Sequence, residues 1–97
     1  MLSDVACRSL AEQYLARIAE QCGENLVLLP TECGTARTLV YSYQTVEYVA
    51  TGDFTYALAG NGPILVSTLT GEVELAGTAL PPEIYVRDFE VRTGTSA

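Results

Sequence analysis

The clearest hydrophobic pattern in the chain lies in its first quarter. Between residues 4 and 22 apolar side chains recur at spacings of three and four, and most charged and amide side chains fall between them. That spacing places the apolar side chains on one stripe of an amphipathic α-helix. Ser3 or Asp4 can cap the amino end of this helix, and Gly23 stands where a left-handed residue commonly ends one. We therefore predict a helix over residues 4–22.

Beyond this helix the pattern changes to short apolar runs. Residues 26–29 are an apolar run that precedes a proline, and residues 38–44 alternate between apolar and polar positions. The alternation places Leu39, Tyr41 and Tyr43 on one face of a strand. Both segments are therefore predicted to be β-strands.

Turn residues separate these runs from one another and from the rest of the chain. Residues 31–37 have the composition of a loop, and residues 46–49 either continue the preceding strand past a bulge or form a short separate element. Residues 64–66 are predicted to form a strand that pairs with residues 72–75 as a hairpin. Pro81-Pro82 suits the first turn of a short C-terminal helix.

The order of these elements limits the architecture. Every connection is too short for a parallel crossover, so the strands must pair antiparallel. We predict an α+β fold in which the N-terminal amphipathic helix packs on one face of an antiparallel sheet of four to five strands, followed by a short C-terminal helix. A chain of 97 residues fits a single domain, which we place at residues 1–92, with a frayed tail at residues 93–97.

Acidic residues dominate the charge. Twelve carboxylates stand against five arginines, with no lysine or histidine, and the formal net charge is −7. Nucleic-acid binding is not expected, because the phosphate backbone would be repelled. The acidic surface either attracts a cationic protein or serves solubility alone. No apolar run reaches the roughly 20 residues of a membrane span, and the N-terminal stretch lacks the apolar core of a signal peptide. A cytoplasmic location is therefore expected.

Candidate catalytic groups are few. Without histidine, Cys33 and the serines lack their usual general base, and no cysteine or histidine spacing suits a metal, so we expect no enzyme, metal or cofactor. Glu72 and Glu74 lie two apart on a predicted strand, with carboxylates about 7 Å apart on one face, a spacing that overlaps that of inverting glycosidases. Two acids on the water-exposed face of a hairpin are the simpler explanation.

Residues 51–66 form the most unusual stretch of the sequence. A glycine-rich phosphate loop would need backbone donors at the start of a helix, whereas here a proline and a strand follow. We expect a structural corner whose glycines allow positive φ. The residues that shape the turn and the corner are Gly52, Gly60, Asn61, Gly62 and Pro63.

This stretch also carries a resemblance to a known family. Residues 48–54 and 56–64, with their Gly-Asn-Gly-Pro motif, resemble the signature of the immunity protein 35 family of bacterial polymorphic toxin systems. The similarity continues through residues 70–73 and 77–79 and covers about residues 38–90.

The resemblance implies a bacterial immunity protein, or antitoxin, that neutralises a cognate toxin by stoichiometric protein–protein interaction. Some relatives stand alone and have been linked to chaperone-like roles, so a holdase-like stress protein is the alternative. The toxin's chemistry stays open between a papain-like peptidase or deamidase and a nuclease. The candidate contact residues are exposed acids and tyrosines: Glu47, Tyr48, Asp53, Tyr56, Glu72 and Glu74.

Overall fold

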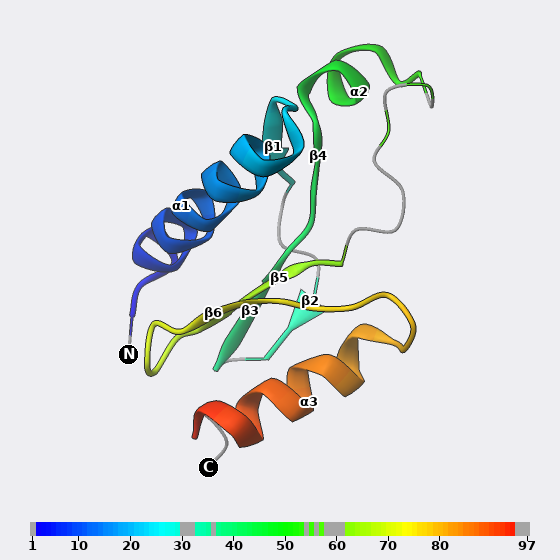
Figure 1. The fold of residues 1–97 in the computed structure, drawn as a ribbon. Coiled ribbons are helices and arrows are strands. Elements are labelled where there is room, and N and C mark those ends of the chain that lie inside the picture. The colour runs from blue at the N-terminus through cyan, green and yellow to red at the C-terminus, as the bar shows by residue number, and fades with distance from the viewer. Residues whose placement is uncertain are drawn as a thin grey trace.

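The fold consists of three helices and six short strands in the part of the chain that the structure describes (Figure 1). The structure is a computed structural model that describes residues 2–29, 33–35, 37–53, 55, 57 and 62–94. Its elements, in chain order, are α1 (Asp4–Cys22), β1 (Leu26–Leu28), β2 (Cys33–Gly34), β3 (Thr38–Tyr41), β4 (Tyr43–Thr45), α2 (Val46–Thr51), β5 (Ile64–Ser67), β6 (Val73–Leu75) and α3 (Pro82–Thr93).

The N-terminal helix has the predicted bounds and the predicted caps. Of the two candidate caps, Ser3 is the one used: its Oγ accepts a hydrogen bond from the Ala6 N–H at 3.1 Å. Gly23 ends the helix in the left-handed conformation, with φ of 72°. The apolar stripe supplies the buried residues of α1, which are Cys7, Ala11 and Leu15.

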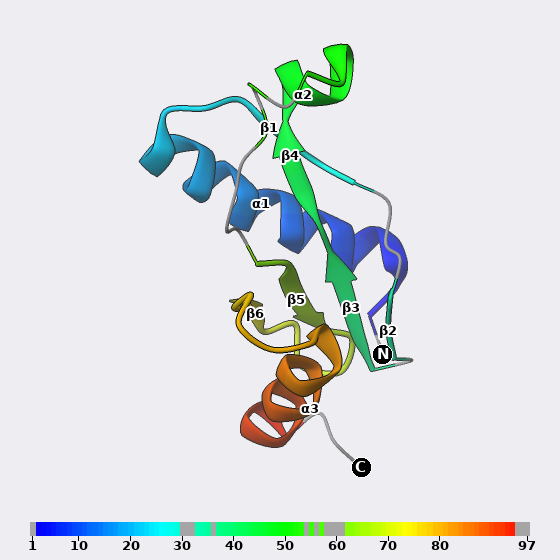
Figure 2. The same cartoon turned by 90° about the vertical axis from the view of Figure 1, so that its right-hand side faces the viewer.

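The strands form two antiparallel sheets, whereas we predicted one. β1 pairs with β4 in a two-stranded sheet, and the other strands lie in the order β2-β3-β5-β6. The α+β class is therefore confirmed and the single sheet is wrong. The segment predicted as one strand over residues 38–44 is interrupted at Ser42, after which the chain leaves the larger sheet and pairs with β1. Figure 2 shows β3 and β4 following one another along one extended path.

Two segments of uncertain or loop character contain regular structure. The predicted loop over residues 31–37 includes β2, whose two residues pair with Val40 and Leu39 of β3. A tight turn places them there, since the Thr35 N–H donates to the Thr38 carbonyl at 2.9 Å. Two paired residues need no apolar signal, which explains why composition missed this strand. Residues 46–49 form the separate element rather than the continued strand, as part of α2.

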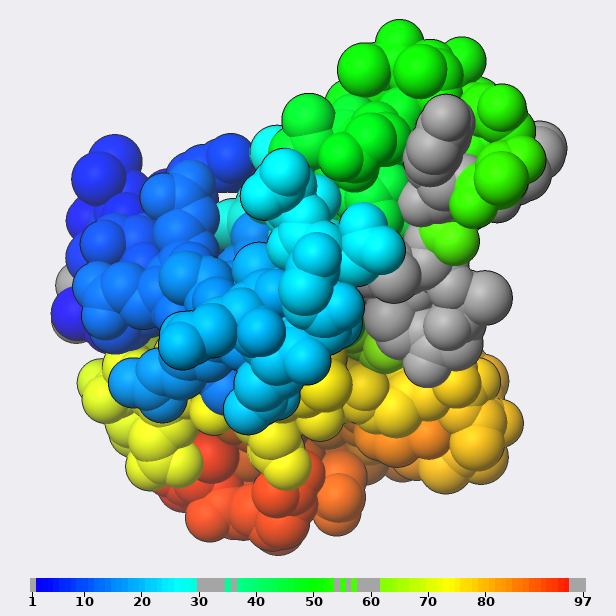
Figure 3. Space-filling view, turned by 45° about the horizontal axis from the view of Figure 1, so that its top comes forward, coloured from blue at the N-terminus to red at the C-terminus, as the bar shows by residue number. Residues whose placement is uncertain are grey.

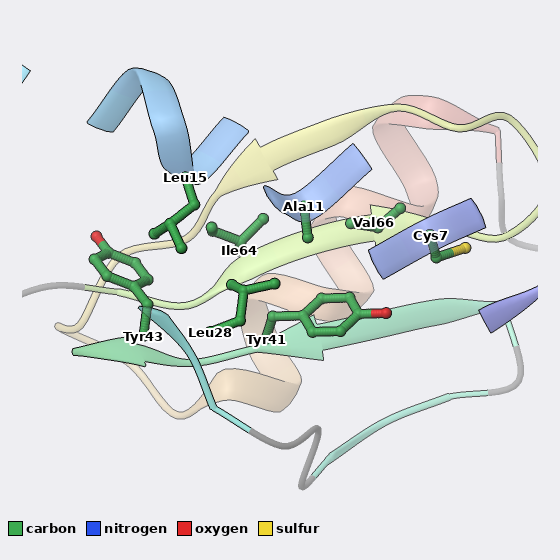
Figure 4. Packing of buried hydrophobic residues seen from close by; sticks show 8 residues of the cluster. All are labelled: Cys7, Ala11, Leu15, Leu28, Tyr41, Tyr43, Ile64 and Val66. Atoms are coloured by element: carbon green, nitrogen blue, oxygen red, sulfur yellow. The ribbon is translucent and has the colours of Figure 1, made fainter. Parts of the chain in front are cut away.

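Both faces of the larger sheet are covered by helices. Figure 4 shows Tyr41, Ile64 and Val66 packed with the buried residues of α1, and Tyr41 lies there as the predicted alternation in residues 38–44 requires. The intervening residues, Val40 and Leu65, pack on the opposite face against α3. All four residues of β5 are buried, and its first three, Ile64 to Val66, form a continuous apolar run because both faces of the strand are covered.

The C-terminal helix begins at the predicted proline and is tied to the sheet by polar contacts. The Thr35 and Thr38 hydroxyls donate to Glu90 Oε2 at 2.7 and 2.6 Å. Thr93, which we assigned to a frayed tail, is instead the last residue of α3, and its hydroxyl donates to the Phe89 carbonyl at 2.8 Å. The helix therefore extends one residue beyond the predicted domain limit.

The hairpin between β5 and β6 forms as predicted, and its geometry explains why residue 62 of the predicted structural corner is a glycine. Pro63 directly precedes β5, and its carbonyl accepts a hydrogen bond from the Ala76 N–H at 2.8 Å. Gly62 does not have positive φ, contrary to our expectation. A Cβ atom on Gly62 would lie 1.7 Å from the Ala76 carbonyl oxygen, so the close approach of two backbones requires glycine there. Gly60 and Asn61 lie outside the described residues.

Candidate functional site

The short helix α2 is fixed at both ends by its own sequence. The Thr45 side chain accepts a hydrogen bond from the Tyr48 N–H at 3.1 Å, which caps the amino end. Gly52 ends the helix with φ of 70°, and its N–H donates to the Tyr48 carbonyl at 2.7 Å. The predicted turn at Gly52 is thus a helix C-cap. These contacts hold a helix that has no buried residue.

The outer side of α2 is apolar and exposed. Val46 and Val49 keep 46% and 53% of their surface in contact with solvent, and Tyr48 is half-buried. In Figure 1, α2 lies at the end of the molecule opposite α3, above the two-stranded sheet. We define the α2 surface by its acidic, apolar and aromatic residues: Glu24, Val46, Glu47, Tyr48, Val49 and Asp53.

The electrostatic environment of this surface is negative. No basic residue occurs anywhere between Arg37 and Arg87. Glu24 lies near α2 because the carbonyl of its neighbour Asn25 accepts a hydrogen bond from the Val46 N–H at 2.9 Å. Within the described part of the chain, Glu47 Oε2 is buried without a hydrogen-bond partner. A buried carboxylate oxygen without a partner is costly.

Asp53 contributes a carboxylate held in one orientation. Its Oδ1 accepts a hydrogen bond from the Thr55 N–H at 2.9 Å, while its own N–H donates to the Thr51 hydroxyl. The backbone hydrogen bond, supported by the Thr55 side chain, lowers the pKa of Asp53. The charge of this residue is therefore kept at acidic pH values where an ordinary aspartate becomes neutral.

The structure brings together three of the predicted contact residues and separates two others. Glu47, Tyr48 and Asp53 lie on the α2 surface, whereas Tyr56 is outside the described residues. The remaining two predicted contact residues, Glu72 and Glu74, belong to the hairpin in the larger sheet.

Glu72 and Glu74 do not form the pair on the water-exposed face of the hairpin that we predicted. Glu72 is exposed but precedes β6 instead of lying in it. Glu74 pairs with the buried Leu65, so it faces α3, and its side chain is 37% exposed. Its Oε1 lies 2.8 Å from Arg92 Nη1, which in turn raises the pKa of the arginine. Glu74 thus already has a partner within the chain.

Sequence reasoning missed three residues of the α2 surface. For Val46 and Val49 the alternatives were a continued strand or a short separate element, although Thr45 three positions before Tyr48 is a recognisable N-cap signal. The pairing of β1 with β4 brings Glu24 close to α2, and no local sequence pattern predicts that pairing. Only the three-dimensional structure places it near α2.

Among residues that the structure describes, no three His, Cys, Asp or Glu side chains gather closely enough to hold a metal ion. None of the helices in this same part of the chain combines the length and apolarity that a bilayer crossing requires.

Comparison with known proteins gives one informative similarity. The uncharacterized protein YrhB of Escherichia coli strain K12 is 36% identical to this chain over 55 residues. The aligned part is 57% of this chain and 58% of YrhB, so the similarity spans less than two thirds of that protein. No family model and no solved structure matches the chain.

Proposed function

We propose that this protein is an immunity protein that binds and neutralises a cognate toxin through the α2 surface. The observation that carries the proposal is the exposed, capped helix α2, which presents apolar side chains among carboxylates and no nearby cation in the sequence. Protein interfaces commonly combine an apolar centre with a charged rim. The resemblance of residues 48–64 to the immunity protein 35 signature supports the same assignment.

The chemistry of the surface favours a toxin with a basic, partly apolar binding face. Carboxylates at Glu24, Glu47 and Asp53 favour approach of a basic toxin surface and accelerate the encounter. Val46 and Val49 then bury apolar area, and Tyr48 offers an aromatic contact of the kind enriched at interface hot spots. An arginine or lysine of the toxin would pair with the exposed carboxylate of Asp53. Inhibition follows if this contact covers the toxin's active site, with no catalysis by the immunity protein.

The experiment is coexpression with the product of the adjacent reading frame. We expect the wild-type chain to rescue growth and to co-purify with that product in stoichiometric amounts. Val49→Arg places a cation in the centre of the surface and should weaken binding about 10- to 100-fold. Val5→Arg is the matched control, because Val5 is 81% exposed on α1, away from α2. Full protection by Val49→Arg, or equal loss in both variants, would overturn the proposed site.

A holdase-like role is the second candidate, and a groove on α3 favours it. Leu80, Ile84 and Val91 are 52%, 41% and 68% exposed. They line a groove of about 370 Å³ together with Tyr85, Arg87 and Asp88, and we call this the α3 groove. A holdase would suppress aggregation of several unrelated heated clients, and Val49→Arg would not change that activity. If the wild-type chain has no effect on such clients, this alternative is excluded.

A further inference from the structure

The outer face of α3 has a regular arrangement of apolar and charged residues. With about 100° of rotation per residue, Ile84 and Val91 lie within about 20° of each other around the helix. They point directly away from the buried residues Val86 and Phe89. Figures 1 and 2 show α3 at one edge of the molecule, with the larger sheet on its inner side. The apolar stripe therefore faces outward.

Arg87 and Asp88 are the charged residues nearest to this stripe, and they flank it on opposite sides. Arg87 lies about 50° to one side of the line through Ile84 and Val91, and Asp88 lies about 50° to the other. Asp88 has one exposed contact, from its Oδ2 to Arg92 Nε at 3.3 Å. Within the described ranges, Arg87 forms no hydrogen bond or ion pair.

From this arrangement we propose that the α3 groove binds a second copy of this chain, with the two α3 helices parallel about a two-fold axis. In that packing each Ile84 and each Val91 meets its own equivalent across the axis. The rotation also brings the side that carries Arg87 against the side of the second copy that carries Asp88. Two opposite-charge contacts thus form, one on each side of the apolar seam.

The charges favour a second copy over other occupants. A uniformly basic partner would be repelled by Arg87, and a uniformly acidic partner would be repelled by Asp88. A second copy of this chain places an aspartate opposite Arg87 and an arginine opposite Asp88, at nearly the same level along the helix. An antiparallel pair would bring Arg87 against Arg87 and Asp88 against Asp88. Only the parallel arrangement forms opposite-charge contacts on both sides of the apolar seam.

The first test measures the mass of the full chain by sedimentation from low to high micromolar concentration. The chain has a mass of 10.4 kDa, and we expect it to approach twice that value as concentration rises. Ile84→Glu should raise the dissociation constant at least about tenfold. Val5→Glu adds the same charge at an exposed position on α1 and should leave dimerisation unchanged. The proposal is overturned if the wild-type chain stays monomeric at every concentration. The same holds if the monomer captures unrelated client proteins but does not dimerise.

Charge reversal then tests the geometry. Arg87→Asp and Asp88→Arg should each weaken the dimer several-fold, although they change the net charge in opposite directions. The double variant restores both opposite-charge contacts and should return the affinity to that of the wild type. If Asp88→Arg strengthens the dimer while Arg87→Asp weakens it, net charge alone is responsible and the parallel packing is wrong. Failure to bind a toxin would leave these measurements unaffected, so the two proposals fail independently.

Discussion

Replacing Gly62 with alanine tests the structural role of the Gly-Asn-Gly-Pro motif. The new Cβ would lie 1.7 Å from the Ala76 carbonyl oxygen and 2.6 Å from its carbon, so the two backbones must separate. The hydrogen bond between the Ala76 N–H and the Pro63 carbonyl lies at this junction and is worth about 1 kcal/mol. Repacking the junction adds about 1–3 kcal/mol. We expect the free energy of unfolding to fall by about 2–4 kcal/mol.

Chemical and thermal unfolding followed by circular dichroism measure this loss. For a domain of this size, the expected change lowers the Tm by roughly 8–30 °C. Gly52→Ala is the matched control, because Gly52 has φ of 70° but a Cβ added there would have no atom within 4 Å. Its cost is the left-handed conformation alone, about 1 kcal/mol. If the two variants differ by less than about 0.5 kcal/mol, close backbone approach is not the reason for Gly62.

Three further predictions concern α2, α3 and the turn after α2. Thr45→Ala removes the N-cap of α2 and should destabilise that helix by about 1 kcal/mol, seen as faster amide exchange within it while α1 is unchanged. Glu90→Gln weakens the acceptor of two threonine hydroxyls and should lower the free energy of unfolding in urea by about 1–2 kcal/mol, against less than about 0.5 kcal/mol for the exposed Glu72→Gln. Because folding lowers the pKa of Asp53, its ionised form stabilises the native state above the unfolded-state pKa, and this contribution is lost as pH falls through the folded value. An NMR titration midpoint at or above the ordinary 3.8 would contradict this assignment.

Local sequence signals predicted the elements whose stability is local. The period of the apolar residues and the caps Ser3 and Gly23 defined α1, and the proline pair placed the start of α3. Alternation in residues 38–44 placed Tyr41 and Tyr43 on the face that packs against α1. In each case a residue and its neighbours within one or two turns determine the outcome.

Features that depend on pairing between distant segments were not predictable in the same way. The division into two sheets arises because β4 pairs with β1 while β3 pairs with β5. The role of Gly62 depends on the backbone of Ala76, which is distant in the sequence. The residues next to Gly62 suggested a positive φ instead. The ion pair of Glu74 with Arg92 likewise requires α3 to cover the sheet. Candidate contacts chosen for charge alone therefore included one acid that already has a partner.

The two proposed surfaces occupy opposite ends of the molecule (Figure 1), and Figure 3 shows the segment that contains α2, in green, at an outer corner of the molecule. A dimer formed through α3 would leave both α2 surfaces free, so it would carry two toxin molecules. Because the two surfaces share no residue, their substitutions should act additively: Val49→Arg should weaken toxin binding without changing the dimer, and Ile84→Glu should do the reverse. A loss of toxin binding by Ile84→Glu at a concentration where it is folded and monomeric would show that the toxin needs both copies. The binding unit would then be the dimer, and its affinity would include the gain from simultaneous contact at two sites.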